Sequence, residues 1–215
     1  MLKSVVFDFD YTLADSSRGA IACVNYAMEG MGLPTASSER ICQTIGMSLP
    51  ATFETLAGEE QRHRAKEFER LFMERAEQVV VDLAVLFATV EPTLRALKSR
   101  GLRLGIVSTK TRRRIVSILQ REGLEGFFDV IIGGEDVQVH KPDPTGLFLA
   151  AGHLGCTVSE LVYVGDSIVD AEAAQRGGID FVAVLSGVTK RESFEGYGVT
   201  AIIGELSELS MVLAG

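Results

Sequence analysis

The sequence is poor in cysteine and in positive charge. Its three cysteines, Cys23, Cys42 and Cys156, are odd in number and lie too far apart to indicate a metal site, so they fit free thiols in a reducing cytoplasm. Lys and Arg number 21 against 29 Asp and Glu, which gives a formal net charge of -8. This balance argues against nucleic acid as a partner, because neutralising phosphates requires a basic surface.

Long apolar runs are also missing. The longest apolar-rich stretch, residues 79–90, contains Asp82 and is too short to span a bilayer. The first twenty residues carry Asp8, Asp10 and Asp15, which a secretory signal does not tolerate. We therefore expect a cytoplasmic protein with no membrane partner, either a monomer or a homodimer. The 215 residues suffice for one large domain, or for one domain with an insertion.

The stretch Ser4–Ser16 stands out because an apolar run ends in two aspartates, Asp8 and Asp10, spaced i, i+2. Buried strands of parallel sheets are typically continuous runs of Val, Ile and Phe. Ligands of such sheets bind just beyond the carboxyl ends of the strands. Two carboxylates placed there are costly unless a cation joins them. The pattern thus favours a metal ion at this strand end.

The rest of the chain divides into a helical block and an alternating α/β block. Helical periodicity and capping residues predict about four helices within residues 16–83. From residue 84 onward, strands are predicted over 104–108, 128–132, 161–164 and 181–185, with helices between them and a last helix over about 206–213. This alternation predicts an α/β fold with a parallel sheet covered by helices, formed by residues 1–15 and 84–215. Residues 16–83 are the insertion.

Several polar side chains follow the predicted strands and should converge on one edge of the sheet. They are Asp8, Asp10, Ser108, Thr109, Asp166 and Asp170, with Lys141 in a loop before a helix. Each has an alternative structural reading. The aspartates could form turns, Ser108 and Thr109 could cap a helix, Lys141 could be solvated, and Asp170 could close a capping box with Ser167. Their joint placement is more informative than any one of them.

Hydrolysis of a phosphate ester would use this set of residues. Asp8, ionised at neutral pH, could attack phosphorus and form an aspartyl-phosphate. Asp10 could protonate the leaving group and then activate water. Mg²⁺ held by Asp8 and Asp166 would screen the negative charges, with Asp170 binding metal waters from further out. Lys141, Ser108 and Thr109 would bind the phosphoryl oxygens.

These motifs, in this order, resemble the haloacid dehalogenase-like hydrolase superfamily. The matching segments are Asp8–Ser16, Val107–Lys110, His140–Pro144 and Gly165–Ser167 with Asp170. The resemblance implies a Rossmann-like core with a helical cap, as in the phosphoglycolate phosphatase and β-phosphoglucomutase branch. It also implies Mg²⁺, which in this family binds the backbone carbonyl of Asp10 as well. The second aspartate favours a phosphatase over a true dehalogenase.

Within that branch the resemblance leaves the substrate open. The segment Ile131–Gln138 looks like phosphoglycolate phosphatases, whereas Ile106–Lys110 also looks like cytoplasmic pyrophosphatases. The loop Ile45–Ser48 lacks the basic residue expected in a sugar-phosphate mutase. Tyr11 and the return segment Val85–Val90 depart from the family pattern. We expect an Mg²⁺-dependent phosphatase that acts on a small phosphorylated metabolite, with phosphoglycolate as the first candidate. The alternatives are a pyrophosphatase, a β-phosphoglucomutase-like enzyme and an inactive binding protein on the same fold.

Overall fold

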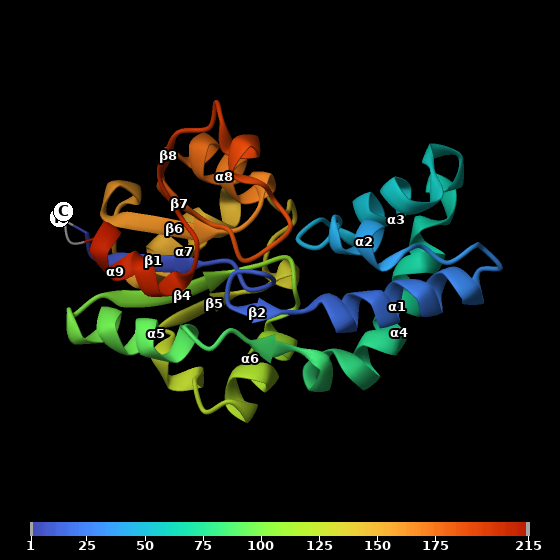
Figure 1. The fold of residues 1–215 in the computed structure, drawn as a ribbon, viewed down its shortest axis with the longest axis horizontal. Helices are drawn as coiled ribbons and strands as arrows, with labels where there is room; N and C mark the ends of the chain where they lie inside the picture. Colours follow the sequence, from blue (N-terminus) through green and yellow to red (C-terminus); the bar gives the residue numbers. More distant parts are fainter. Residues whose placement is uncertain (1, 214–215) are drawn as a thin grey trace. The chain divides into compact units, whose positions relative to one another are not determined.

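A computed structural model describes residues 2–213 of the chain, which divide into two compact units (Figure 1). One unit consists of the residues up to Ala14 and from Leu86 onward; the other is residues 15–85. The chain passes between them at two short strands, β2 (Ala14–Asp15) and β3 (Val85–Leu86), which pair as a two-stranded sheet. The sequence did not predict these two strands.

The first unit is built on a six-stranded parallel sheet in the order β5-β4-β1-β6-β7-β8. The strands are β1 (Ser4–Phe7), β4 (Arg103–Val107), β5 (Val130–Ile132), β6 (Leu161–Gly165), β7 (Asp180–Val184) and β8 (Val199–Ile203). β1 lies between β4 and β6 and is buried along its whole length, as its apolar sequence predicts. The parallel α/β core expected from the sequence is confirmed, and β8 is a strand that the sequence analysis missed.

Helices cover both faces of this sheet (Figure 1). α7 and α8 share one hydrophobic cluster with Val6, Tyr163 and Phe181, whereas α5 and α6 lie against the other face. The helices are α5 (Val90–Ser99), α6 (Arg112–Arg121), α7 (Thr145–Leu154), α8 (Ile168–Gly177) and α9 (Leu209–Val212). Short 3₁₀ helices lie at Glu125–Phe127, Gly134–Asp136, Val158–Glu160, Arg191–Phe194 and Leu206–Glu208.

The second unit is helical throughout. It contains α1 (Ser17–Gly30), α2 (Ser38–Cys42), α3 (Leu49–Ala57), a 3₁₀ helix (Glu59–Arg64) and α4 (Ala65–Leu83). Its core includes the stacked rings of Phe53 and Phe68, whose centroids are 4.8 Å apart. The charged segment after Gly58 forms a 3₁₀ helix before α4 begins. No helix among the described residues is long and apolar enough to cross a membrane.

Candidate active site

Asp8 and Asp10 follow directly after β1, in a tight loop. The amide of Asp8 donates to the carbonyl oxygen of Val164 at 2.9 Å, which continues the parallel pairing of β1 with β6 past the strand end. Both carboxylate residues are buried. Tyr11 has a left-handed backbone (φ 60°), and its carbonyl oxygen accepts a hydrogen bond from Ser186 Oγ. A strained turn therefore fixes where the two aspartates lie.

Asp8, Asp166 and Asp170 form a buried carboxylate cluster. Each offers one oxygen, and these oxygens all lie within 4.8 Å of one another. Asp166 directly follows β6, and Asp170 lies in the first turn of α8, so the structure brings Asp8 together with two aspartates that are more than 150 positions away in the sequence. Convergence at the carboxyl edge of the sheet explains this proximity.

Lys141 is the ammonium group that faces this cluster. Its Nζ lies 2.8 Å from Asp8 Oδ1 and 2.6 Å from Asp170 Oδ1. The hydroxyl of Tyr163, a fully buried residue of β6, lies 3.0 Å from the same Nζ and 2.8 Å from Asp170 Oδ1. The solvated-loop reading of Lys141 is wrong, because its side chain is only 5% exposed. Tyr163 is a contact that the sequence analysis counted only as an apolar strand residue.

Burial and charge shift the pKa values of these groups. Burial, together with the carboxylates of Asp170 and Asp10, raises the pKa of Asp8 to about 6, although the Lys141 ammonium opposes the shift. Burial, with the charges of Asp170 and Asp8, also raises the pKa of Asp166 well above its usual value. Burial alone would lower the pKa of Lys141, but the two carboxylates outweigh it and raise that pKa. The cluster therefore carries more negative charge than Lys141 compensates.

This excess of negative charge suits a divalent cation. Three carboxylates face one ammonium. The ammonium of Lys141 is shared, because its Nζ pairs with Asp8 Oδ1 at 2.8 Å and with Asp170 Oδ1 at 2.6 Å. Hard divalent cations such as Mg²⁺ bind carboxylate oxygens. Asp8 and Asp166 are the side chains that would hold the ion, so the residues present fit a Mg²⁺ site.

Two further contacts fix Asp166. Thr12 Oγ1 lies 3.4 Å from Asp166 Oδ1. Gly187 packs so closely that a Cβ added there would lie 2.0 Å from Asp166 Oδ2 and 3.1 Å from Tyr11 Cβ. Only a glycine allows the backbone to approach this carboxylate so closely. Sequence reasoning gave neither Thr12 nor Gly187 a role, because the contact depends on how a distant loop folds back.

Asp170 serves two purposes in this geometry. Its Oδ2 accepts hydrogen bonds from the amide and the hydroxyl of Ser167, while its own amide donates to Ser167 Oγ. This is the capping box that the spacing of the two residues predicts. Its other oxygen, Oδ1, faces Lys141 and Tyr163. Asp170 therefore caps the N-terminus of α8, and its Oδ1 also belongs to the carboxylate cluster.

Asp10 does not belong to the cluster of Asp8, Asp166 and Asp170, and its carboxylate forms an ion pair with a lysine other than Lys141. Lys110 Nζ is 2.8 Å from Asp10 Oδ1, and both side chains are nearly buried, at 11% and 10% exposed. The Lys110 ammonium also lies 5.9 Å from the ring centroid of Phe9. Lys110 belongs to the motif Val107–Lys110, but sequence reasoning assigned it no role, because nothing in the spacing of the residues relates it to Asp10.

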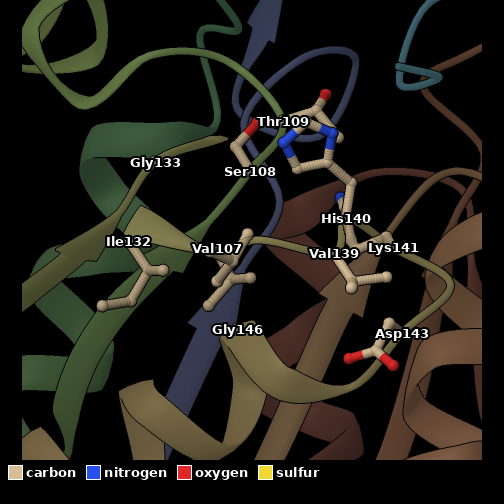
Figure 2. A pocket seen from close by; sticks show the side chains of 11 residues that line it. Val107, Ser108, Thr109, Ile132, Gly133, Val139, His140, Lys141, Asp143 and Gly146 are labelled. Carbon is tan, nitrogen blue, oxygen red and sulfur yellow. The ribbon is translucent and has the colours of Figure 1, made fainter. Parts of the chain in front are cut away.

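Ser108 and Thr109 share a surface pocket with Lys141 and His140 (Figure 2). The helix-capping reading of the two hydroxyl residues is wrong, since α6 takes Thr111 as its N-cap and the carboxylate of Glu135 accepts from the amide of Arg112. Ser108 Oγ instead lies 3.4 Å from the amide nitrogen of Lys110. Ser108, Thr109 and Lys141 therefore line one common pocket.

His140 and the arginine run complete the surroundings. His140 Nε2 lies 3.1 Å from the carbonyl oxygen of Gly134, which joins the Lys141 loop to the loop that packs on Thr109. Arg112 and Arg113 are exposed, but Arg114 is buried.

Comparisons with known proteins identify the family. The family model described as haloacid dehalogenase-like hydrolase matches residues 5–184. Phosphoglycolate phosphatase from Salmonella typhimurium is 34% identical over 217 aligned positions, covering 89% of this chain and 84% of that protein. Phosphoglycolate phosphatase from Escherichia coli K12 is 32% identical over 219 positions, covering 90% and 85%.

A solved structure supports the same grouping. A haloacid dehalogenase-like hydrolase from Bacteroides fragilis superposes with a TM-score of 0.93 at 41% sequence identity, covering 97% of this chain and 100% of that one. The family suggested by the sequence motifs is thus confirmed. The chain belongs to the haloacid dehalogenase-like hydrolases, as a phosphoric monoester hydrolase of the phosphoglycolate phosphatase branch.

Proposed function

We propose that this enzyme hydrolyses phosphoglycolate, with Mg²⁺ as cofactor and Asp8 as the nucleophile. The observation that carries the proposal is the buried cluster of Asp8, Asp166 and Asp170 around Lys141, at the carboxyl edge of the sheet. The names of the bacterial relatives support the choice of phosphoglycolate. Cys23, Cys42 and Cys156 form no disulfide within residues 2–213, which is compatible with the reducing cytoplasm in which we place the reaction.

In the first step, an Asp8 carboxylate oxygen attacks phosphorus. A bond forms between that oxygen and phosphorus, and the bond from phosphorus to the ester oxygen breaks. Asp10 acts as the general acid and gives a proton to the departing alkoxide. Lys141 places positive charge on the phosphoryl oxygens, and Ser108 and Thr109 donate hydrogen bonds to them. The products of this step are the alcohol and an aspartyl-phosphate on Asp8.

In the second step, Asp10 takes a proton from water as the water oxygen attacks phosphorus. The bond between Asp8 and phosphorus breaks, inorganic phosphate leaves, and the Asp8 carboxylate is restored. Mg²⁺, held by Asp8, Asp166 and the Asp10 carbonyl, would supply positive charge that screens the nucleophile from the substrate. We assign two roles to Asp170: it would bind water molecules held by the ion, and it fixes the position of the Lys141 ammonium.

We further propose that residues 16–83 act as a cap domain that sets the substrate range. Their helical content and their insertion after the first strand support this assignment. Inorganic pyrophosphate is the second candidate substrate, because Lys110 adds a positive charge next to Asp10, where a second phosphate would leave. The complete set of Asp8, Asp10, Lys141 and Asp166 argues against an inactive binding protein.

Phosphate release from a panel of phosphorylated metabolites tests the proposal. We expect turnover of phosphoglycolate that requires Mg²⁺ and that stops with EDTA. Asp8→Asn should abolish it, while Asp180→Asn, which changes an exposed aspartate at the start of β7, should not. Turnover that is unchanged in Asp8→Asn would contradict the assigned nucleophile. Preference for pyrophosphate over phosphoglycolate would replace the substrate and leave the chemistry in place.

A further inference from the structure

Lys110 is a second nearly buried lysine of the site, and the two reaction steps proposed for phosphoglycolate give it no task. Lys141 lies against Asp8 and Asp170, the residues on the nucleophile side. Lys110 Nζ lies 2.8 Å from Asp10 Oδ1. Because Asp10 delivers a proton to the leaving oxygen, whatever contacts the Asp10 carboxylate lies next to the leaving group.

Stability alone is a weak reason to keep this ion pair. Both side chains are about one-tenth exposed, so pairing them costs two desolvations that the attraction between the charges only partly offsets. Lysine is almost never fully buried unless it is paired. By contrast, the side chains of the ion pair Lys98–Asp129 are 30% and 39% exposed, so that pair loses less hydration. The difference indicates that Lys110 has a task in the site.

The backbone around Lys110 is held on both sides, so its position does not depend on a flexible loop. The carbonyl oxygen of Lys110 accepts a hydrogen bond from the Gly134 amide at 3.0 Å. Its amide lies 3.4 Å from Ser108 Oγ. Gly134 packs so tightly that an added Cβ would lie 2.4 Å from the Thr109 carbonyl oxygen. The ammonium is thus preorganised beside Asp10 before any substrate binds.

We propose that Lys110 selects substrates whose leaving group carries an anionic group close to the ester oxygen. This proposal rests on the proposed function, and it names the class of leaving group. An ammonium has three donors, and the contact with Asp10 Oδ1 engages one of them. In phosphoglycolate a single carbon separates the ester oxygen from the carboxylate, and in pyrophosphate the leaving group is itself a phosphate. In both, the anion can reach Lys110 while Asp10 reaches the leaving oxygen.

The test compares two substrates that differ only in this anion. Phosphoglycolate has a carboxylate where ethyl phosphate has a methyl group. Lys110→Met should lower the ratio of kcat/KM for phosphoglycolate to that for ethyl phosphate by about 10-fold to 100-fold, as expected for the loss of one charge-assisted hydrogen bond. Lys110→Arg should restore part of the ratio, because it keeps the charge. Lys98→Met, which removes the exposed lysine of the other pair, should leave the ratio unchanged.

The outcomes separate this proposal from the proposed function. An equal loss for both substrates would show that Lys110 only supports Asp10, and it would overturn the selection while the phosphatase reaction stands. A wild-type enzyme that does not prefer phosphoglycolate or pyrophosphate over ethyl phosphate would also overturn it. Absence of turnover with every phosphate ester would remove the proposed function as well. If Lys110→Met does not fold, as judged by circular dichroism, Lys110→Gln replaces it in the same ratio.

Discussion

The hydroxyl of Tyr163 lies 3.0 Å from the ammonium nitrogen of Lys141, at a fully buried position of β6. The same hydroxyl is 2.8 Å from Asp170 Oδ1 and 3.2 Å from the carbonyl oxygen of Val107. Tyr163 of β6 and Val107 of β4 thereby help to fix the position of the Lys141 ammonium. Because a hydroxyl carries a single proton, it can donate to only one of these two oxygens at a time while it accepts from Lys141.

Tyr163→Phe should therefore weaken the site without changing its charges. We expect kcat/KM to fall about 10-fold, and the free energy of unfolding to fall by about 1–2 kcal/mol, because buried polar groups lose a partner. Enzyme kinetics and urea unfolding measure the two effects. Tyr26→Phe is the matched control, since the Tyr26 hydroxyl bonds Glu74 at an exposed position of the helical unit. The account is wrong here if both variants behave alike.

Gly187→Ala should weaken Mg²⁺ binding, because the added methyl group would clash with the Asp166 carboxylate. The new Cβ would lie 2.0 Å from Asp166 Oδ2, so the carboxylate must move. We expect the Mg²⁺ concentration for half-maximal activity to rise about 10-fold to 100-fold. Gly152→Ala in α7 is the control, because its Cβ meets no heavy atom of the described chain within 4 Å and alanine is favoured in a helix. Equal Mg²⁺ requirements in the two variants would show that Asp166 does not depend on this contact.

Asp8 should make the metal-free protein less stable as the pH rises. Its pKa is about 6 in the folded state and 3.8 ordinarily, so between these values the folded state binds more protons than the unfolded state. The free energy of unfolding then falls with rising pH over this window and levels off above it. Asp8→Asn removes the effect, and in EDTA it should be more stable than the wild type by up to about 3 kcal/mol at pH 7. Urea unfolding of both proteins at pH 4.5 and pH 7 measures this, and a difference that does not grow between the two values would contradict it.

Mg²⁺ should reverse that instability. A ligand that binds only the folded state raises the free energy of unfolding, by about 2.7 kcal/mol at a hundred times its Kd. Thermal unfolding with increasing Mg²⁺ should show this rise in the wild type. Asp166→Asn should lose most of it, while Asp180→Asn keeps it. A rise of equal size in Asp166→Asn would place the ion elsewhere.

The fold was predictable where burial dominates the sequence pattern. β1 and β6 are fully buried and read as apolar runs, and Gly155 and Gly178 end α7 and α8 with left-handed backbones as glycine allows. β8 was missed because its residues are mostly half-exposed. Its pairing with β7 also shifts register between Phe181 and Val182, which no local pattern reveals.

The site was predictable to the extent that it lies at strand ends. The aspartates Asp8 and Asp166 follow adjacent parallel strands, so topology alone brings them together. Tyr163, Lys110 and Gly187 were not predictable in this way. The hydroxyl of Tyr163 contacts the Lys141 ammonium, and this contact depends on the register in which β1 and β6 pair. The ammonium of Lys110 contacts the Asp10 carboxylate because its long side chain extends to it. Such contacts depend on tertiary geometry that neither periodicity nor spacing encodes.

The most direct test of the account is to look for phosphate on Asp8. Acid quench of Asp10→Asn during turnover of phosphoglycolate, followed by mass spectrometry of the peptide containing residues 4–16, would detect it. Because Asp10→Asn lacks the group that activates water, the account predicts that phosphate accumulates on Asp8, and that none is found when Asp8→Asn is combined with it. Turnover with an unmodified Asp8, or phosphate on another residue of the chain, would contradict the central claim.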